Sequence, residues 1–93
     1  MKHTNTVTRY QGNVEQLVEE IGDLYYDALA THLHLLAEKM AKDGKADAAR
    51  GRKKLAAELM ACSRHLMQAA AHIDSAWLIC KPLTDPVRKA AKS

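Results

Sequence analysis

The sequence predicts an all-α protein, an antiparallel two-helix hairpin that self-associates, in the simplest case into a dimeric four-helix bundle. Three observations predict this fold. The composition is 47 % hydrophobic and 27 % charged, with Ala, Leu, Glu, Lys and Met prominent, which favours helix. Apolar residues recur every three or four positions over two long runs, and a polar segment with a glycine separates them. A chain of 93 residues has room for one domain.

Residues 1–12 are polar and lack apolar periodicity, so we expect a flexible N-terminal arm. The arm has no apolar segment of the kind that signal peptides carry. No later run reaches the ~20 uninterrupted apolar residues of a membrane span. The sequence therefore predicts a cytoplasmic protein that does not contact a membrane.

The first helix is expected over about residues 13–42. Asn13 is a good N-cap, and Gln16 stands where a capping box places its second residue. An apolar stripe then follows the helical period, with a second row beside it that includes Leu17, Leu24 and Ala28. The stripe consists of Val14, Val18, Ile21, Tyr25, Leu29, Leu33 and Leu36, and continues to Met40.

The second helix is expected over about residues 47–80. Gly44 is a candidate for the left-handed residue that ends the first helix, and Asp47 for the cap of the second. Pro82 is expected to end the second helix, which makes residues 13–81 the helical domain. Residues 82–93 form a basic tail with room for one short helix after Asp85. The second apolar stripe consists of Leu55, Leu59, Cys62, Leu66, Ile73 and Trp77.

A turn centred near Gly44 and Lys45 would pair residues whose numbers sum to about 90, with Cys62 beside Ala28 or Leu29. Each stripe is widened by a second row, which for the second helix includes Ala56, Met60 and Met67, and one partner helix cannot cover both rows. The sequence therefore predicts a homodimer, parallel or antiparallel. A different helical partner is the alternative.

Four carboxylates form an acidic ridge on the first predicted helix: Glu19, Glu20, Asp23 and Asp27. Glu20, Asp23 and Asp27 would share one helical face, where carboxylates can hold Mg²⁺. The run from Glu19 to Leu24 is similar to the Glu-x-x-Asp motif of the all-α nucleotide pyrophosphohydrolases related to MazG. The resemblance implies a metal-dependent nucleotide hydrolase in which Glu20 and Asp23 bind the metal. That family also carries a Glu-Glu-x-x-Glu motif on a preceding helix, and only the polar arm precedes here.

A basic cluster surrounds the predicted turn and consists of Arg50, Arg52, Lys53 and Lys54. Such a cluster can contact the phosphates of a nucleic acid or another polyanion. No aromatic residue alternates with these bases, so stacking on single-stranded bases is not indicated. Solvated charge around a turn is the simpler interpretation.

The remaining reactive side chains do not form a recognisable catalytic or metal-binding pattern. His65 and His72 lie two turns apart on one helix, whereas chelation of one ion uses adjacent turns. Cys62 and Cys80 are 18 positions apart, about 27 Å along one helix, and are expected to be reduced. We therefore expect no catalytic residues, no metal and no cofactor. The predicted function is a non-enzymatic interaction or regulatory module acting as a homo-oligomer, with polyanion binding and nucleotide hydrolysis as alternatives.

Overall fold

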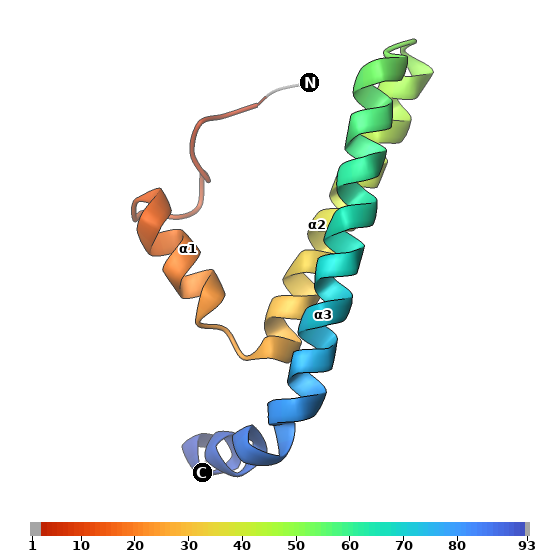
Figure 1. Ribbon diagram of the computed structural model, residues 1–93. Helices are drawn as coiled ribbons and strands as arrows, with labels where there is room; N and C mark the ends of the chain where they lie inside the picture. The colour runs from red at the N-terminus through yellow and green to blue at the C-terminus, as the bar shows by residue number, and fades with distance from the viewer. Residues whose placement is uncertain (1–2, 93) are drawn as a thin grey trace.

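The computed structural model describes residues 3–92, and for residues 84–92 it describes the backbone only. The described chain contains three helices, α1 (Val14–Gly22), α2 (Tyr26–Ala49) and α3 (Lys53–Lys92), and no strand. The predicted all-α class is confirmed. Figure 1 shows α2 and α3 lying side by side in opposite directions, while α1 stands apart from both.

Helix α1 begins as the sequence predicts. The side chain of Asn13 accepts a hydrogen bond from the Gln16 N–H at 2.8 Å, and the Gln16 side chain accepts one from the Asn13 N–H at 3.0 Å. This reciprocal capping box satisfies two backbone donors that the first turn of a helix leaves unpaired. The arm before it contains only turns and bends among residues 3–12.

The expectation of one helix over residues 13–42 is wrong, because the chain leaves the helical path at Asp23 and re-enters it at Tyr26. Asp23 caps α1 with its N–H directed at the carbonyls of Glu19 and Ile21. Tyr25, with φ −54° and ψ 145°, is the non-helical N-cap residue that precedes α2. Gly22, a poor helix former, lies directly before the break. The apolar periodicity continues across these residues and therefore conceals the break.

The expected turn at Gly44 and Lys45 is also wrong. Gly44 lies inside α2, which runs on to Ala49, and the glycine that reverses the chain is Gly51, with a φ of 80°. The Gly51 N–H bonds to the Ala48 carbonyl at 3.0 Å, and the Arg52 N–H bonds to the Asp47 carbonyl at 2.9 Å. These two bonds form a Schellman motif, which needs a left-handed residue that glycine adopts without steric cost.

The contact between α2 and α3 is a row of small residues, here called the seam. The Ser63 hydroxyl donates a 2.7 Å hydrogen bond to the carbonyl of Ala37, which fixes the pairing of residues whose numbers sum to 100 rather than 90. Seam residues recur every seven positions, so one side of each helix meets the other along its length. The seam consists of Ala30, Ala37 and Gly44 on α2 and of Ala56, Ser63 and Ala70 on α3, and all six are buried.

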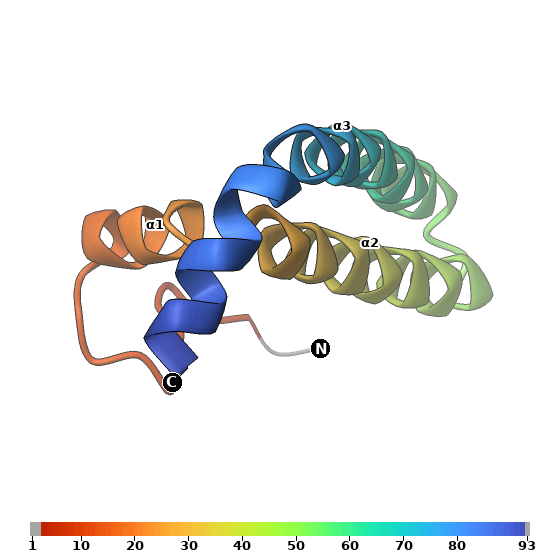
Figure 2. The same ribbon diagram turned by 90° about the horizontal axis from the view of Figure 1, so that it is seen from below.

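Helix α3 extends beyond the start of α2. It remains helical through Pro82, so the expected end of the second helix near residue 80 is wrong. A proline inside a helix removes one backbone hydrogen bond and kinks the helix. In Figures 1 and 2 the blue end of α3 accordingly bends away from α2, toward the side on which α1 lies. The side chains that follow Leu83, with the Asp85 cap expected there, lie outside the described residues.

The molecule is extended for its size. Its radius of gyration is 16.5 Å, whereas a compact domain of 93 residues has about 12 Å. Its accessible surface is 7509 Å², whereas a compact monomer of 10.3 kDa exposes about 5,400 Å². About 2,100 Å² of additional surface is therefore exposed.

Candidate functional site

The residues of the predicted stripes do not form a buried core in the single chain. The seam passes beside them, so the helices meet over alanines, and every buried hydrophobic residue among those described is an alanine: Ala30, Ala37, Ala56 and Ala70. On α1, Val14 and Val18 are 64 % and 62 % exposed, and Ile21 is also exposed. At the start of α2, Tyr25 and Tyr26 are exposed as well.

One side of the α2–α3 pair carries most of the large apolar residues, and we call it the apolar flank. Its members lie one position before or three positions after a seam residue, which places them on the same side of each helix. Leu36 and Leu55 are each 46 % exposed, and Cys62 is exposed. The other members are half-buried. The flank consists of Leu29, Leu33, Leu36 and Met40 on α2 and of Leu55, Leu59, Cys62, Leu66 and Ile73 on α3.

The flank is hollowed near the connection between α2 and α3. A cavity of about 300 Å³ is lined there by the apolar residues Met40, Leu55 and Leu59 and by the charged residues Asp43, Asp47 and Arg52. His3, from the arm, also lines this cavity. The arm therefore approaches the flank at this end, whereas α1 does not pack on the α2–α3 pair.

The opposite side of the pair is more polar. His34 there contacts the Met67 sulfur through Nδ1 at 3.4 Å and Asp74 Oδ2 through Nε2 at 3.1 Å. Both Met67 and Asp74 lie four positions after a seam residue, as His34 does, which confirms that these positions face one another across the pair. The two sides of the pair therefore differ in character, with one apolar and the other hydrogen-bonded.

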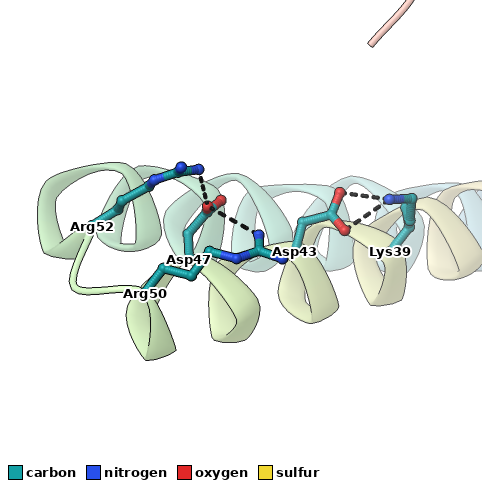
Figure 3. A network of polar contacts seen from close by, with 5 residues as sticks. All are labelled: Lys39, Asp43, Asp47, Arg50 and Arg52. Carbon is teal, nitrogen blue, oxygen red and sulfur yellow. Dashed lines mark hydrogen bonds and ion pairs between the residues drawn. The ribbon is translucent and has the colours of Figure 1, made fainter. Parts of the chain in front are cut away.

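The buried carboxylate of Asp47 binds two arginines of the connection between α2 and α3 (Figure 3). Asp47 is fully buried, and its Oδ1 accepts a hydrogen bond from Arg52 at 3.2 Å and lies 4.0 Å from the Arg50 guanidinium. The two guanidinium groups compensate the charge that Asp47 carries into the interior. One turn earlier, Lys39 donates to both oxygens of Asp43 at 2.6–2.7 Å.

The predicted basic cluster is therefore divided by the structure. Arg50 and Arg52 turn toward Asp47. Lys53 and Lys54 are exposed at the start of α3 and take part in no ion pair within residues 3–83. The negative charge of Asp47 partly neutralises these two arginines, which weakens their attraction for phosphates. In the structure, Arg50 and Arg52 hold the connection between α2 and α3.

The predicted acidic ridge is also divided. Glu19 and Glu20 lie on α1 and Asp23 caps that helix, whereas Asp27 lies in the first turn of α2, beyond the break. The expectation that Glu20, Asp23 and Asp27 share one helical face is therefore wrong. Within residues 3–83, whose side chains are described, no group of three His, Cys, Asp or Glu residues is placed to hold a metal ion.

One member of the ridge has a different partner. The Tyr10 hydroxyl, in the arm, donates a hydrogen bond to Glu20 Oε2 on α1. This bond to a carboxylate raises the pKa of Tyr10 above its ordinary value of 10.0, with burial and the negative charge of Glu20 acting in the same direction. The contact ties the arm to α1, and sequence reasoning had no signal for it.

Sequence reasoning also missed a second cavity at the open end of the α2–α3 pair. It measures about 340 Å³ and is lined by the break between α1 and α2 together with Trp77 and Cys80 of α3. Trp77 follows Ala56, Ser63 and Ala70 at the seven-residue spacing, so the seam ends where a large ring replaces a small side chain. The side chain of Cys62 is exposed and that of Cys80 is half-buried.

Among the described residues, no helix combines the length and the apolar character needed to cross a membrane. No protein-family model, curated protein or solved structure matches this chain.

Proposed function

We propose that the protein is a non-enzymatic helical interaction module that acts as a homo-oligomer, in the simplest case a dimer in which two α2–α3 hairpins form a four-helix bundle. One observation carries the proposal: the hydrophobic residues that the described chain buries between α2 and α3 are all alanines, while the large apolar side chains of the apolar flank are exposed or half-buried. Folding of small domains relies on burial of large apolar side chains, and each contributes about 1.5–3 kcal/mol when fully buried.

The exposed area has the size that an obligate dimer needs. Standard interfaces bury about 800 Å² on each partner, and obligate homodimers bury more. The excess of about 2,100 Å² over a compact monomer is large enough for such an interface. The flank between Leu29 and Ile73 carries no charged residue at its centre, so two copies can face one another there without repulsion.

Sedimentation equilibrium of the full chain tests the proposal. We expect a dimer at micromolar concentration. Leu36→Glu should produce a monomer, because it places a charge at the centre of the flank. Leu35→Glu is the matched control: Leu35 is the adjacent residue and is more exposed, at 58 %, but it lies on the side of α2 that faces away from α3.

A folded parent protein that is monomeric at micromolar concentration would overturn the homo-oligomer and leave the flank for a different protein. Equal effects of Leu36→Glu and Leu35→Glu on a dimeric parent would show that the dimer does not use the flank.

A further inference from the structure

We infer that the dimer is antiparallel and that α1 of each copy docks on the connection end of its partner, where the basic residues of the α2–α3 connection lie. This inference rests on the proposed self-association and adds which surfaces meet. Two observations support it. The acidic residues of α1 and the basic residues of the α2–α3 connection belong to different parts of the molecule, and each of these parts carries accessible apolar residues.

Helix α1 carries an apolar surface that the arm covers only in part, through Tyr10 and the cavity that arm residues line together with Val14 and Leu17. Among residues 3–83, whose side chains are described, α1 makes no substantial packing contact with α2 or α3, and Val14 and Val18 are largely exposed. Leu17 and Ile21 continue the same row at helical spacing, and Leu17 lines a cavity together with Val7 and Tyr10 of the arm. A helix of nine residues is too short to be stable in water by itself, so its stability requires packing of this row against another surface.

The charges of α1 and of the connection are opposite. From Val14 to Asp23 the chain carries four acids, Glu15, Glu19, Glu20 and Asp23, and no base. From residue 43 to residue 57 it carries five bases, Lys45, Arg50, Arg52, Lys53 and Lys54, against the two acids Asp43 and Asp47. The first segment therefore has a net charge of −4 and the second a net charge of +3.

The link from α1 to α2 and the connection between α2 and α3 lie at opposite ends of the α2–α3 pair. Residues 22–26, which link α1 to α2, lie beside Trp77 and Cys80, at the open end of the pair, whereas the connection is at the other end. A dimer with a two-fold axis perpendicular to α2 places the open end of one copy beside the connection of the other. Each acidic α1 then meets a basic connection, and the contact occurs twice because the interface is isologous. A parallel dimer would instead bring the two basic connections together, which is unfavourable.

The connection end of the α2–α3 pair also has an apolar cavity in which side chains of a partner helix could bind. The cavity lined by Met40, Leu55 and Leu59 opens on the apolar flank beside Arg52. Valine side chains from a short helix match such a depression in size and character. Lys53 and Lys54 stand exposed at the start of α3, where they can face Glu15 and Glu19 of the partner.

A charge-reversal experiment on the full chain tests the inference. The dimer dissociation constant is measured at low ionic strength for three variants: Glu15→Lys with Glu19→Lys, Lys53→Glu with Lys54→Glu, and all four substitutions together. We expect each double variant to weaken the dimer by about tenfold and the fourfold variant to regain most of the loss, because exposed charge pairs contribute up to about 1 kcal/mol each. Glu38→Lys with Glu58→Lys is the control, since these exposed acids lie on the outer sides of α2 and α3.

The outcomes separate this inference from the proposed function. A dimer whose dissociation constant is the same in the parent and in both double variants would overturn the inference and leave the flank dimer intact. Loss of dimer in both double variants without recovery in the fourfold variant would also overturn it, because recovery is the signature of direct contact. A monomeric parent would overturn the proposed function and this inference with it. Helix content, followed by circular dichroism, shows that each variant is folded.

Discussion

The sulfur of Met60 lies over Gly44, 2.8 Å from the point where a Cβ atom would stand, and the Ala56 carbonyl oxygen lies 3.4 Å from that point. Gly44 lies within α2 and does not have a positive φ. Glycine is therefore needed at this position because a side chain would lack space, not because the backbone conformation requires it. The closest approach of α2 and α3 near the connection depends on this residue.

We predict that Gly44→Ala changes the free energy of unfolding by less than about 1 kcal/mol. Alanine is a better helix former than glycine by about 1 kcal/mol, which offsets the displacement of the flexible Met60 side chain. Gly44→Leu should destabilise the protein by about 1–3 kcal/mol, because it forces the helices apart. Urea unfolding at fixed protein concentration measures both, with Ala48→Leu, at an exposed position of α2, as the control. Equal stabilities of Gly44→Leu and Ala48→Leu would contradict the close packing at the seam.

We predict that Arg52→Gln destabilises the protein by about 1–2 kcal/mol, because it leaves the buried carboxylate of Asp47 without its nearest cation. The Arg52 side chain is half-exposed, so the loss is smaller than for a fully buried ion pair. The neighbouring Lys53→Gln, which removes the same charge from an exposed position, should change the stability by less than about 0.5 kcal/mol. Thermal unfolding at one protein concentration compares the two. A larger loss for Lys53→Gln would mean that Asp47 does not depend on Arg52.

We predict that Tyr10 titrates above pH 10 and that Glu20→Gln lowers its pKa. The folded-state pKa of Tyr10 is raised, so the contact stabilises the arm on α1 below pH 10 and is lost as the pH rises through the raised pKa. An ultraviolet difference titration measures the ionisation. Glu19→Gln is the control on the adjacent residue, and Tyr10→Phe should remove the raised transition.

The sequence was sufficient to predict the helical class, the capping box at Asn13 and the polarity of the arm, since these depend on local periodicity and local hydrogen bonds. It was not sufficient to locate the seam. Hydrophobic periodicity marks the side of a helix that carries the largest apolar residues, here Leu29, Leu36 and Leu55, whereas two closely packed helices meet over small residues one position away. Burial of Ala37 against Ser63 depends on both helices at once and has no signal in either alone.

Gly44 was assigned the role that Gly51 has in the structure, for a related reason. Gly44, between Asp43 and Lys45, has the same local signature as a helix C-terminus, and Gly51, between Arg50 and Arg52, has it too. Only the partner helix distinguishes them, because Gly44 must lie opposite Ala56. The buried Asp47 was interpreted as a cap for the second helix, since a carboxylate beside a turn usually lies in solvent. Its burial follows from the arginines that the connection brings back to it.

Because the seam residues repeat every seven positions, the α2–α3 pair could be lengthened by inserting seven residues in each helix. We call each such repeat of the seam a step. Every step presents the same kind of contact, a small residue on α2 against a small residue on α3, so the contact itself does not distinguish one step from the next. Adding seven residues to each helix beside the connection would therefore reproduce the packing and lengthen the rod by about 10 Å at 1.5 Å per residue. The seam ends at Trp77 on one side and at the ion pair between Asp47 and Arg52 on the other, and these two features set its present length. Between these two ends, the hydrogen bond from Ser63 to the Ala37 carbonyl holds the present pairing.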